Sequence, residues 1–370
     1  MYFCTMKNNI FAATMIIVTV SACSRDIDKL CRRQFPDDGP AASVLVMQHD
    51  SIIYEGYFGY ANLETGERTT PESLFCLASI SKQFTAAAIL QMQDRGLLSV
   101  NDPVRKYIPE LKSSVWDSIT ISHLLSHSSG IPDNRRKIYT LHQRIDFNDS
   151  LTLEYLYNID TLNFKPGEFY EYINPTFVLA GHILEVISGQ DLNDYMRENI
   201  FDKAGMKNSV YFDAEHQDAI PSRVYGYDRE DKRKEWTRYD YGQETCFATR
   251  ADGALYSNVR EYASWFKALK GGKIISESAL NDAWTPHIQV AGSPFSSYCG
   301  RDDTYYGYGF LIECPGQEDS WRIYHRGGNG GFHNIAAWYP KDETLIVLLT
   351  ARPDWEHYSF LGKVKFSLGK

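Results

Sequence analysis

The chain has 370 residues, of which 43% are apolar and 23% are charged, proportions that are usual for a soluble globular protein. This length fits one large domain or two closely packed lobes. The formal net charge is −9, and lysine and arginine cluster only briefly, at 134–137 and 232–234. The composition therefore argues against nucleic acid as a partner.

The first 22 residues read as an export signal. An apolar run over residues 10–20 has the length of the hydrophobic part of a signal peptide and is too short to span a bilayer. It ends in Val20-Ser21-Ala22-Cys23, which resembles the lipobox of bacterial lipoproteins and implies cleavage before Cys23 and lipidation of its thiol. The alternative is an ordinary secretory peptide cut near Ala22. We therefore expect an exported lipoprotein, anchored to a bacterial membrane in the periplasm or at the cell surface.

The cysteines outside this signal give no metal motif. Five cysteines remain if Cys4 leaves with the signal and Cys23 carries lipid, and an odd number leaves at least one free thiol unless chains pair. Export permits a disulfide, and Cys299 and Cys314 are a candidate pair. The chain has no C-x-x-C sequence, which argues against a structural zinc site.

Strand patterns stand at both ends of the chain, and helix patterns fill its middle. Residues 23–40 are polar and contain two prolines, so they predict a tether. Strands are expected at 43–48, 52–59, around 306–312, 321–328, 336–339 and 344–349. Helices are expected at 79–95, 103–108, 120–127, 175–188, 192–201 and 259–270. A turn is expected at 252–257, and the patterns assign no clear element within 133–163 or 211–250.

This order predicts an α+β fold. The two ends of the chain, about 41–75 and 255–370, would form a sheet lobe, with a helical lobe of about 76–254 inserted between them. Residues 41–370 then make one folded unit that follows the signal peptide (1–22) and the tether (23–40).

Ser79 and Lys82 lie at the start of the first long helix pattern. Positions three apart share one face of a helix, so the two side chains are expected to point the same way. A serine hydroxyl is a weak nucleophile and needs a base beside it, and a lysine amine packed against a buried helix can be that base. The pattern S-x-x-K is known from serine nucleophiles. The alternative is a helix-capping serine with a solvated lysine.

Tyr172 and Asn174 alternate around Ile173, just before a helix pattern. In an extended chain they face the same side, so one segment offers a phenol and a carboxamide together. The phenol could take the Ser79 proton and pass it to a leaving group, and Asn174 could contact a substrate carbonyl. The alternative is a packed tyrosine followed by an asparagine that caps the next turn.

His325 and Gly327 share one face of a strand, while Arg326 should point to the opposite face. Glycine would let a substrate backbone lie against the strand, and His325 could orient a polar end of the substrate or tune Tyr172. The N–H of Gly328 could join that of Ser79 in an oxyanion hole. The glycine-rich run at 327–331 is not a phosphate loop, because the pattern that follows it is that of a strand and not of a helix.

His123 and His127 have a spacing that can hold zinc, but the glutamate of H-E-x-x-H is missing between them. We therefore expect these histidines to hydrogen-bond loops, and no metal or other cofactor.

The order S-x-x-K, Y-x-N, H-x-G resembles the serine β-lactamase-like hydrolases on the class C side. That group includes class C β-lactamases, D-alanyl-D-alanine carboxypeptidases, D-aminopeptidases and related esterases. The resemblance covers about residues 41–350, with further similar stretches at 56–61, 74–84, 102–109, 123–130, 253–257, 306–310 and 325–332. It implies a mainly antiparallel sheet flanked by helices and packed on an all-helical lobe, with the site between them.

The resemblance also implies roles for single residues. Ser79 would be the acylated nucleophile, and Lys82 and Tyr172 the proton-transfer pair. Asn174, His325 and Gly327 would bind substrate, and the N–H groups of Ser79 and Gly328 would form the oxyanion hole. β-Lactamases of this group have K-T-G where this chain has His325-Arg326-Gly327, which argues against strong β-lactamase activity and resembles the peptidase and esterase branches.

The sequence therefore predicts an exported serine hydrolase that forms an acyl-enzyme on peptides or esters, best on cell-wall peptides that contain D-amino acids. A promiscuous esterase or weak β-lactamase is the alternative among enzymes. A non-catalytic binder of cell-wall fragments is the alternative from another class. The sequence leaves the oligomeric state open.

Overall fold

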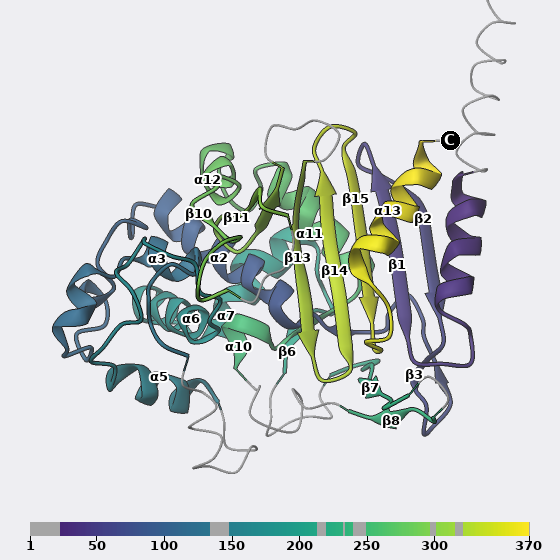
Figure 1. Ribbon diagram of the computed structural model, residues 1–370, viewed down its shortest axis with the longest axis horizontal. Helices are drawn as coiled ribbons and strands as arrows, with labels where there is room; N and C mark the ends of the chain where they lie inside the picture. Colours follow the sequence, from purple (N-terminus) through teal and green to yellow (C-terminus); the bar gives the residue numbers. More distant parts are fainter. Residues whose placement is uncertain are drawn as a thin grey trace, which may run out of the picture.

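The protein is described here from a computed structural model, in which residues 23–133, 148–212, 220–231, 234–239, 249–296, 301–314 and 321–369 are described. An eight-stranded sheet stands beside a group of helices (Figure 1). The strands follow the order β10-β11-β12-β13-β14-β15-β1-β2, and every neighbouring pair is antiparallel. The predicted α+β fold with a mainly antiparallel sheet is thereby confirmed.

Two distant parts of the chain build this sheet. Strand β1 pairs with β15 along its whole length, so that Ala42 lies opposite Thr350 and Gln48 opposite Thr344. The eight strands are Ala42–Gln48 (β1), Ser51–Phe58 (β2), Ile288–Gln289 (β10), Thr304–Tyr306 (β11), Leu311–Glu313 (β12), Arg322–Asn329 (β13), Phe332–Tyr339 (β14) and Thr344–Thr350 (β15). The hairpins expected from both ends of the sequence are present.

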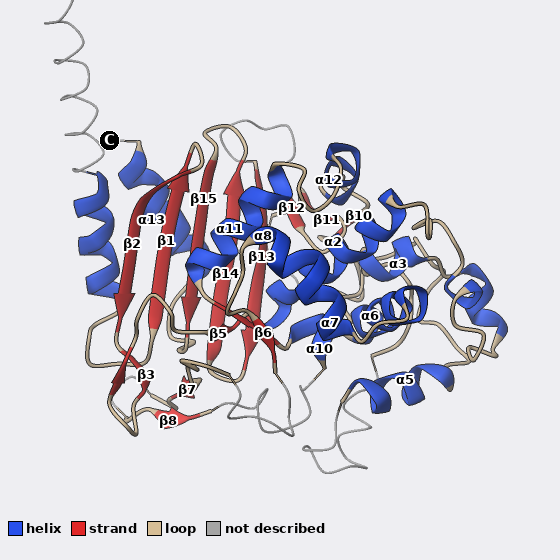
Figure 2. Ribbon diagram, turned by 180° about the vertical axis from the view of Figure 1, so that it is seen from behind, coloured by secondary structure: helices blue, strands red, loops and turns tan. Residues whose placement is uncertain are grey.

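Helices cover both faces of the sheet, because the central strands are apolar on both sides. Successive side chains of a strand point to opposite faces. Val44 and Val46 of β1 join an apolar cluster with α13 (His357–Leu368), whereas Leu45 and Met47 join the cluster on the other face. Figures 1 and 2 show α13 on one face and α11 (Val259–Lys270) on the other.

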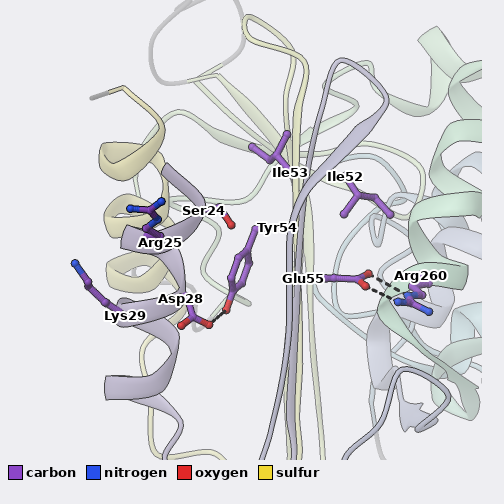
Figure 3. A pocket seen from close by; sticks show the side chains of 9 residues that line it. All are labelled: Ser24, Arg25, Asp28, Lys29, Ile52, Ile53, Tyr54, Glu55 and Arg260. Atoms are coloured by element: carbon purple, nitrogen blue, oxygen red, sulfur yellow. Dashed lines mark hydrogen bonds and ion pairs between the residues drawn. The ribbon is translucent and has the colours of Figure 1, made fainter. Parts of the chain in front are cut away.

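The expected polar tether is wrong in its first part. Residues 23–34 form a helix, and Ile27 and Cys31 are buried together with Phe35 against the sheet. Their spacing of four residues places them on one helix face, a pattern that the many charged neighbours conceal. Tyr54 of β2 points to this helix and donates to Asp28 (3.3 Å), while the next residue, Glu55, points to the opposite face and pairs with Arg260 of α11 (Figure 3).

The long helices of the middle region agree with the sequence patterns. Helices α6 (Pro175–Ser188) and α11 have the predicted bounds, and Gly189 ends α6 in the left-handed conformation with φ 67°. This region also contains α2 (Ser81–Asp94), α3 (Ile121–Leu125), α7 (Leu192–Met196), α8 (Asp202–Ala204) and the short helical turns Val104–Lys106, Ser114–Ser118 and Arg197–Phe201. The expected helix at 103–108 is thus a single 3-10 turn.

Besides the helix of residues 23–34 and some short turns, the helices α5 (Asp149–Tyr157), α10 (Arg250–Gly253), α12 (Glu277–Ala283) and α13 have no counterpart in the sequence prediction. The expected turn at 252–257 is instead the end of α10 followed by β9 (Leu255–Ser257). Strand β9 lies between β5 (Phe75–Cys76) and β6 (Val210–Tyr211), two segments far from it in sequence. Two further ribbons pair β3 (Tyr60–Asn62) with β4 (Glu67–Arg68) and β7 (Tyr227–Asp228) with β8 (Thr237–Arg238).

Cys314 has a free thiol, and its candidate partner Cys299 lies outside the described residues. Within the described part of the chain, no helix has the length and apolar character needed to cross a membrane.

Candidate active site

Ser79 lies in a helical turn, Ala78–Ile80, between strand β5 and helix α2. The preceding residue, Ala78, is buried and has φ 49°, a left-handed conformation that is costly for a residue with a Cβ. The N–H of Leu77 donates to the carbonyl of Leu255 in β9 (2.7 Å), which fixes the start of this turn. The strained turn places Ser79 at the wall of a cleft.

Lys82 is fully buried on α2, one turn after Ser79. Its Nζ lies 3.1 Å from Ser79 Oγ and donates to the main-chain carbonyl of Asp252 (2.7 Å). The structure therefore brings the S-x-x-K pair together, as the helical spacing predicts. The carbonyl of Asp252 escaped the sequence analysis, because a main-chain acceptor leaves no mark in the residue pattern.

Tyr172 and Asn174 stand just before α6, and the ring of Tyr172 borders the same amine. The Nζ of Lys82 lies 5.1 Å from the centroid of the Tyr172 ring and 5.6 Å from that of Phe177, so aromatic faces shield it from water. Asn174 is the residue before α6, but its side chain makes no capping hydrogen bond. Its Oδ1 is buried without a hydrogen-bond partner among the described residues. The capping alternative for Asn174 is therefore wrong.

His127 holds the Tyr172 segment in place. Its carbonyl accepts from Glu171 N–H (2.9 Å), its Nδ1 accepts from Ile173 N–H (3.3 Å), and its ring lies 4.2 Å from that of Tyr172. His123 caps its own helix α3, since its Nδ1 accepts from the N–H of the N-cap residue Thr120 (3.2 Å). The expectation that these histidines hydrogen-bond loops is thus confirmed for His127 and not for His123.

His325 is 2% exposed, and both of its ring nitrogens are occupied. Nδ1 donates to the carbonyl of Arg326 (2.6 Å), so Nε2 accepts from the hydroxyl of Tyr306 (2.8 Å). Burial lowers the pKa of His325 to about 3, and the imidazole is neutral. Burial also keeps the pKa of Tyr306 well above its usual value, which retains the donating proton. The sequence analysis missed this tyrosine, because its partner is 19 residues away on another strand.

Gly327 is required by packing inside the protein. A Cβ at this position would lie 2.1 Å from the carbonyl oxygen of Leu77, so β13 can pass the Ser79 turn only with glycine here. At Gly328, by contrast, a Cβ would meet nothing within 4 Å. Gly327 also lines the cleft beside Ser79, so the expectation that it lets a substrate lie against the strand stays a prediction.

Comparison with known proteins identifies the family. The family model named Beta-lactamase matches residues 31–363. The chain belongs to the beta-lactamase family. It is 28% identical over 328 residues to penicillin-binding protein 4* of Bacillus subtilis, a match that covers 85% of this chain and 69% of the relative.

Solved structures show the same fold. The octameric penicillin-binding protein homologue from Pyrococcus abyssi superposes with a TM-score of 0.77 and 26% identity over 93% of this chain and 76% of its own. D-amino acid amidase from Ochrobactrum anthropi SV3 superposes with a TM-score of 0.74 and 20% identity over 95% and 98%. The members of this fold family are serine hydrolases.

In this member of the beta-lactamase family, Ser79, Tyr172 and His325 border one cleft of about 750 Å³. The cleft follows an open strand edge, because β12 pairs only with the first three residues of β13, Arg322 to Tyr324. The guanidinium carbon of Arg326 lies 5.7 Å from the centroid of the Tyr358 ring, and both residues line the cleft. The open edge leaves room for an extended substrate beside Ser79.

Proposed function

We propose that the protein is an exported serine hydrolase that forms an acyl-enzyme on Ser79, with peptides that contain D-amino acids as the preferred substrates. The observation that carries this proposal is the 3.1 Å contact between Ser79 Oγ and the buried Nζ of Lys82. A nucleophile within hydrogen-bond reach of a base that a third group orients is the arrangement that acyl transfer needs. Here the carbonyl of Asp252 is the third group.

The proposed reaction begins with a neutral Lys82. One N–H of the amine donates to the carbonyl of Asp252, and the amine accepts the proton of Ser79, whose Oγ lies 3.1 Å from Nζ. Ser79 Oγ then bonds to the substrate carbonyl carbon, and the N–H groups of Ser79 and Gly328 stabilise the oxyanion. The proton passes by way of Tyr172 to the leaving nitrogen or oxygen as its bond to carbon breaks. Water then hydrolyses the acyl-enzyme with the same groups in reverse roles.

Asn174 and His325 have different parts in this proposal. Asn174 Oδ1 is a buried acceptor without a partner among the described residues, so a substrate amide N–H would satisfy it. His325 already has hydrogen bonds at both nitrogens, so it positions the Tyr306–Tyr172 packing and does not itself bind substrate. Because this imidazole is neutral, His325 supplies no cation in the place of the lysine of β-lactamases, so we expect any β-lactamase activity to be weak.

The proposed location is the outer side of a bacterial membrane, with lipid on Cys23. The lipobox-like sequence supports it, and so do the relatives named penicillin-binding proteins. Residues 23–34 are helical, and this helix packs on the sheet. In this proposal the folded body therefore follows the anchor directly, without a long flexible tether.

The test is intact mass spectrometry of residues 24–370 mixed with a penicillin, beside assays on D-amino-acid peptides and simple esters. A stable adduct on Ser79 together with peptide hydrolysis would support the proposal. Rapid hydrolysis of the penicillin would favour the β-lactamase alternative. Hydrolysis of esters without hydrolysis of peptides would favour the esterase alternative. Undiminished peptide hydrolysis by Ser79→Ala would exclude the acyl-enzyme. Affinity for wall fragments without any adduct would favour the non-catalytic binder.

A further inference from the structure

The walls of the active-site cleft differ in chemistry. Part of the lining is apolar or aromatic, namely Tyr170, Tyr172, Phe295 and Leu311. Another part is polar or charged, namely Arg326, His333, Glu356 and His357. Six large apolar side chains are left exposed in the described part of the chain, and among them Phe295, at 39%, is the one that lines this cleft.

Phe295 is held by two other rings. Its centroid lies 4.8 Å from that of Phe164 and 5.9 Å from that of Phe169, and these two rings meet edge to face at 5.7 Å. Such contacts fix the ring while one part of it stays open to the cleft. We call Phe164, Phe169 and Phe295 the aromatic shelf.

The aromatic shelf is tied to the segment that carries Tyr172. The hydroxyl of Ser293 donates to the carbonyl of Tyr170 (2.6 Å) and accepts from the N–H of Phe295 (3.3 Å). Tyr170 is two residues before Tyr172 in the same segment. The position of the shelf relative to the Tyr172 hydroxyl is therefore set by short, direct contacts.

We propose that the aromatic shelf binds an apolar side chain on the leaving group of the substrate. This inference rests on the proposed function, in which Tyr172 passes the Ser79 proton to the leaving nitrogen or oxygen and must lie within hydrogen-bond reach of that atom. A group attached to the leaving atom then lies beside Tyr172, and the shelf is the surface next to it. The enzyme accordingly prefers peptides in which an aromatic or branched apolar D-residue follows the scissile bond. A methyl group is too short to cover the rings.

The test uses the peptides acetyl-L-Lys-D-Ala-D-Xaa, with D-Ala, D-Leu or D-Phe in the last place. We expect kcat/KM to rise by up to about fourfold for each methylene that the rings cover, and about tenfold or more from D-Ala to D-Phe. Phe295→Ala should hydrolyse the three peptides at similar rates, and Phe295→Leu should keep much of the preference. Phe366→Ala is the matched control, because this ring is 68% exposed on α13 and does not line the cleft.

An ester series separates the two sides of the scissile bond. Hexyl acetate, which has the longer leaving alcohol, should be preferred to ethyl acetate, and this preference should depend on Phe295. Any preference for ethyl hexanoate, which has the longer acyl group, over ethyl acetate should not depend on Phe295. If Phe295→Ala keeps the preference for the longer leaving alcohol, the proposal is overturned. The proposal is also overturned if the rates depend only on the length of the acyl group.

Labelling of Ser79 by a fluorophosphonate keeps the two proposals apart. A labelled enzyme without a leaving-group preference would leave the proposed function intact and overturn the role of the shelf. If there is neither labelling nor hydrolysis, the proposed function fails, and calorimetry then decides the role of the shelf. Tighter binding of D-Ala-D-Phe than of D-Ala-D-Ala that depends on Phe295 would support it, and equal affinities would overturn it.

Discussion

The floor and the walls of the cleft are built in different ways. We call Lys82 and His325 the floor of the cleft. Both side chains are buried, and they donate to the main-chain carbonyls of Asp252 and Arg326, respectively. At the wall, the exposed ring of Phe295 rests on other side chains. Main-chain contacts tie the floor to the fold itself, whereas side-chain contacts can be exchanged one residue at a time. The chemistry is therefore rigidly specified, and substrate preference is the part that substitutions can change.

The largest expected effect is at the floor. Lys82→Met removes the amine and keeps an unbranched side chain of similar size, so we expect kcat/KM to fall by about 10²–10⁴-fold, the usual contribution of a general base. Steady-state rates on the preferred peptide measure this loss, and circular dichroism checks the fold. Lys363→Met, at an exposed position of α13, is the control and should retain activity. Comparable rates for both variants would mean that Lys82 is not the base.

The next effect compares two neighbouring glycines. Gly327→Ala places a methyl group 2.1 Å from the main-chain oxygen of Leu77, just before the turn that carries Ser79. This substitution should lower the free energy of unfolding by about 1–3 kcal/mol. Gly328→Ala meets nothing within 4 Å, so its stability should change by less than about 0.5 kcal/mol. Urea denaturation measures both values. Equal stabilities would show that β13 does not press on the turn.

A smaller effect is expected from the hydrogen bond between Tyr306 and His325. Tyr306→Phe removes the hydroxyl that donates to His325 and leaves a buried acceptor unsatisfied, at a cost of about 1–3 kcal/mol of stability. If His325 positions Tyr172, the pH–rate profile should change as well. The control is Tyr305→Phe, on the opposite face of the same short strand. A variant with the stability and profile of the wild type would refute the role of Tyr306.

The smallest effect near neutral pH concerns the charged wall. His357 is 6% exposed, and burial, with the nearby charges of His333 and Arg326, lowers its pKa to about 2. The unfolded chain takes up this proton near pH 6.5, well before the folded protein, so His357 destabilises the fold as the pH falls below that value. Its share is about 1.4 kcal/mol per pH unit, and His357→Gln should flatten the slope by this amount between pH 6 and pH 4. An unaltered slope would show that His357 is protonated in the folded protein.

Local patterns predicted the elements that are held by their own sequence. The bounds of α6 and α11 follow from apolar spacing and terminal signals, and the β1–β2 hairpin follows from its turn. Strand β9 and the helix of residues 23–34 could not be read in this way. Strand β9 exists because β5 and β6 flank it, and the polar-looking helix is fixed by the apolar face of the sheet on which it packs.

The same division holds within the site. By itself, the sequence identified Ser79 and Lys82 as candidates and determined that they share a helix face, because helical spacing is a local property. Only the tertiary structure decided that the carbonyl of Asp252 accepts from the Lys82 amine and that Tyr306 donates to His325. It also decided that Gly327 packs against the chain just before Ser79 and that Phe295 lines the cleft. Each of these contacts joins segments far apart in the chain. Such contacts are set by how the sheet and helices pack, and no local pattern records them.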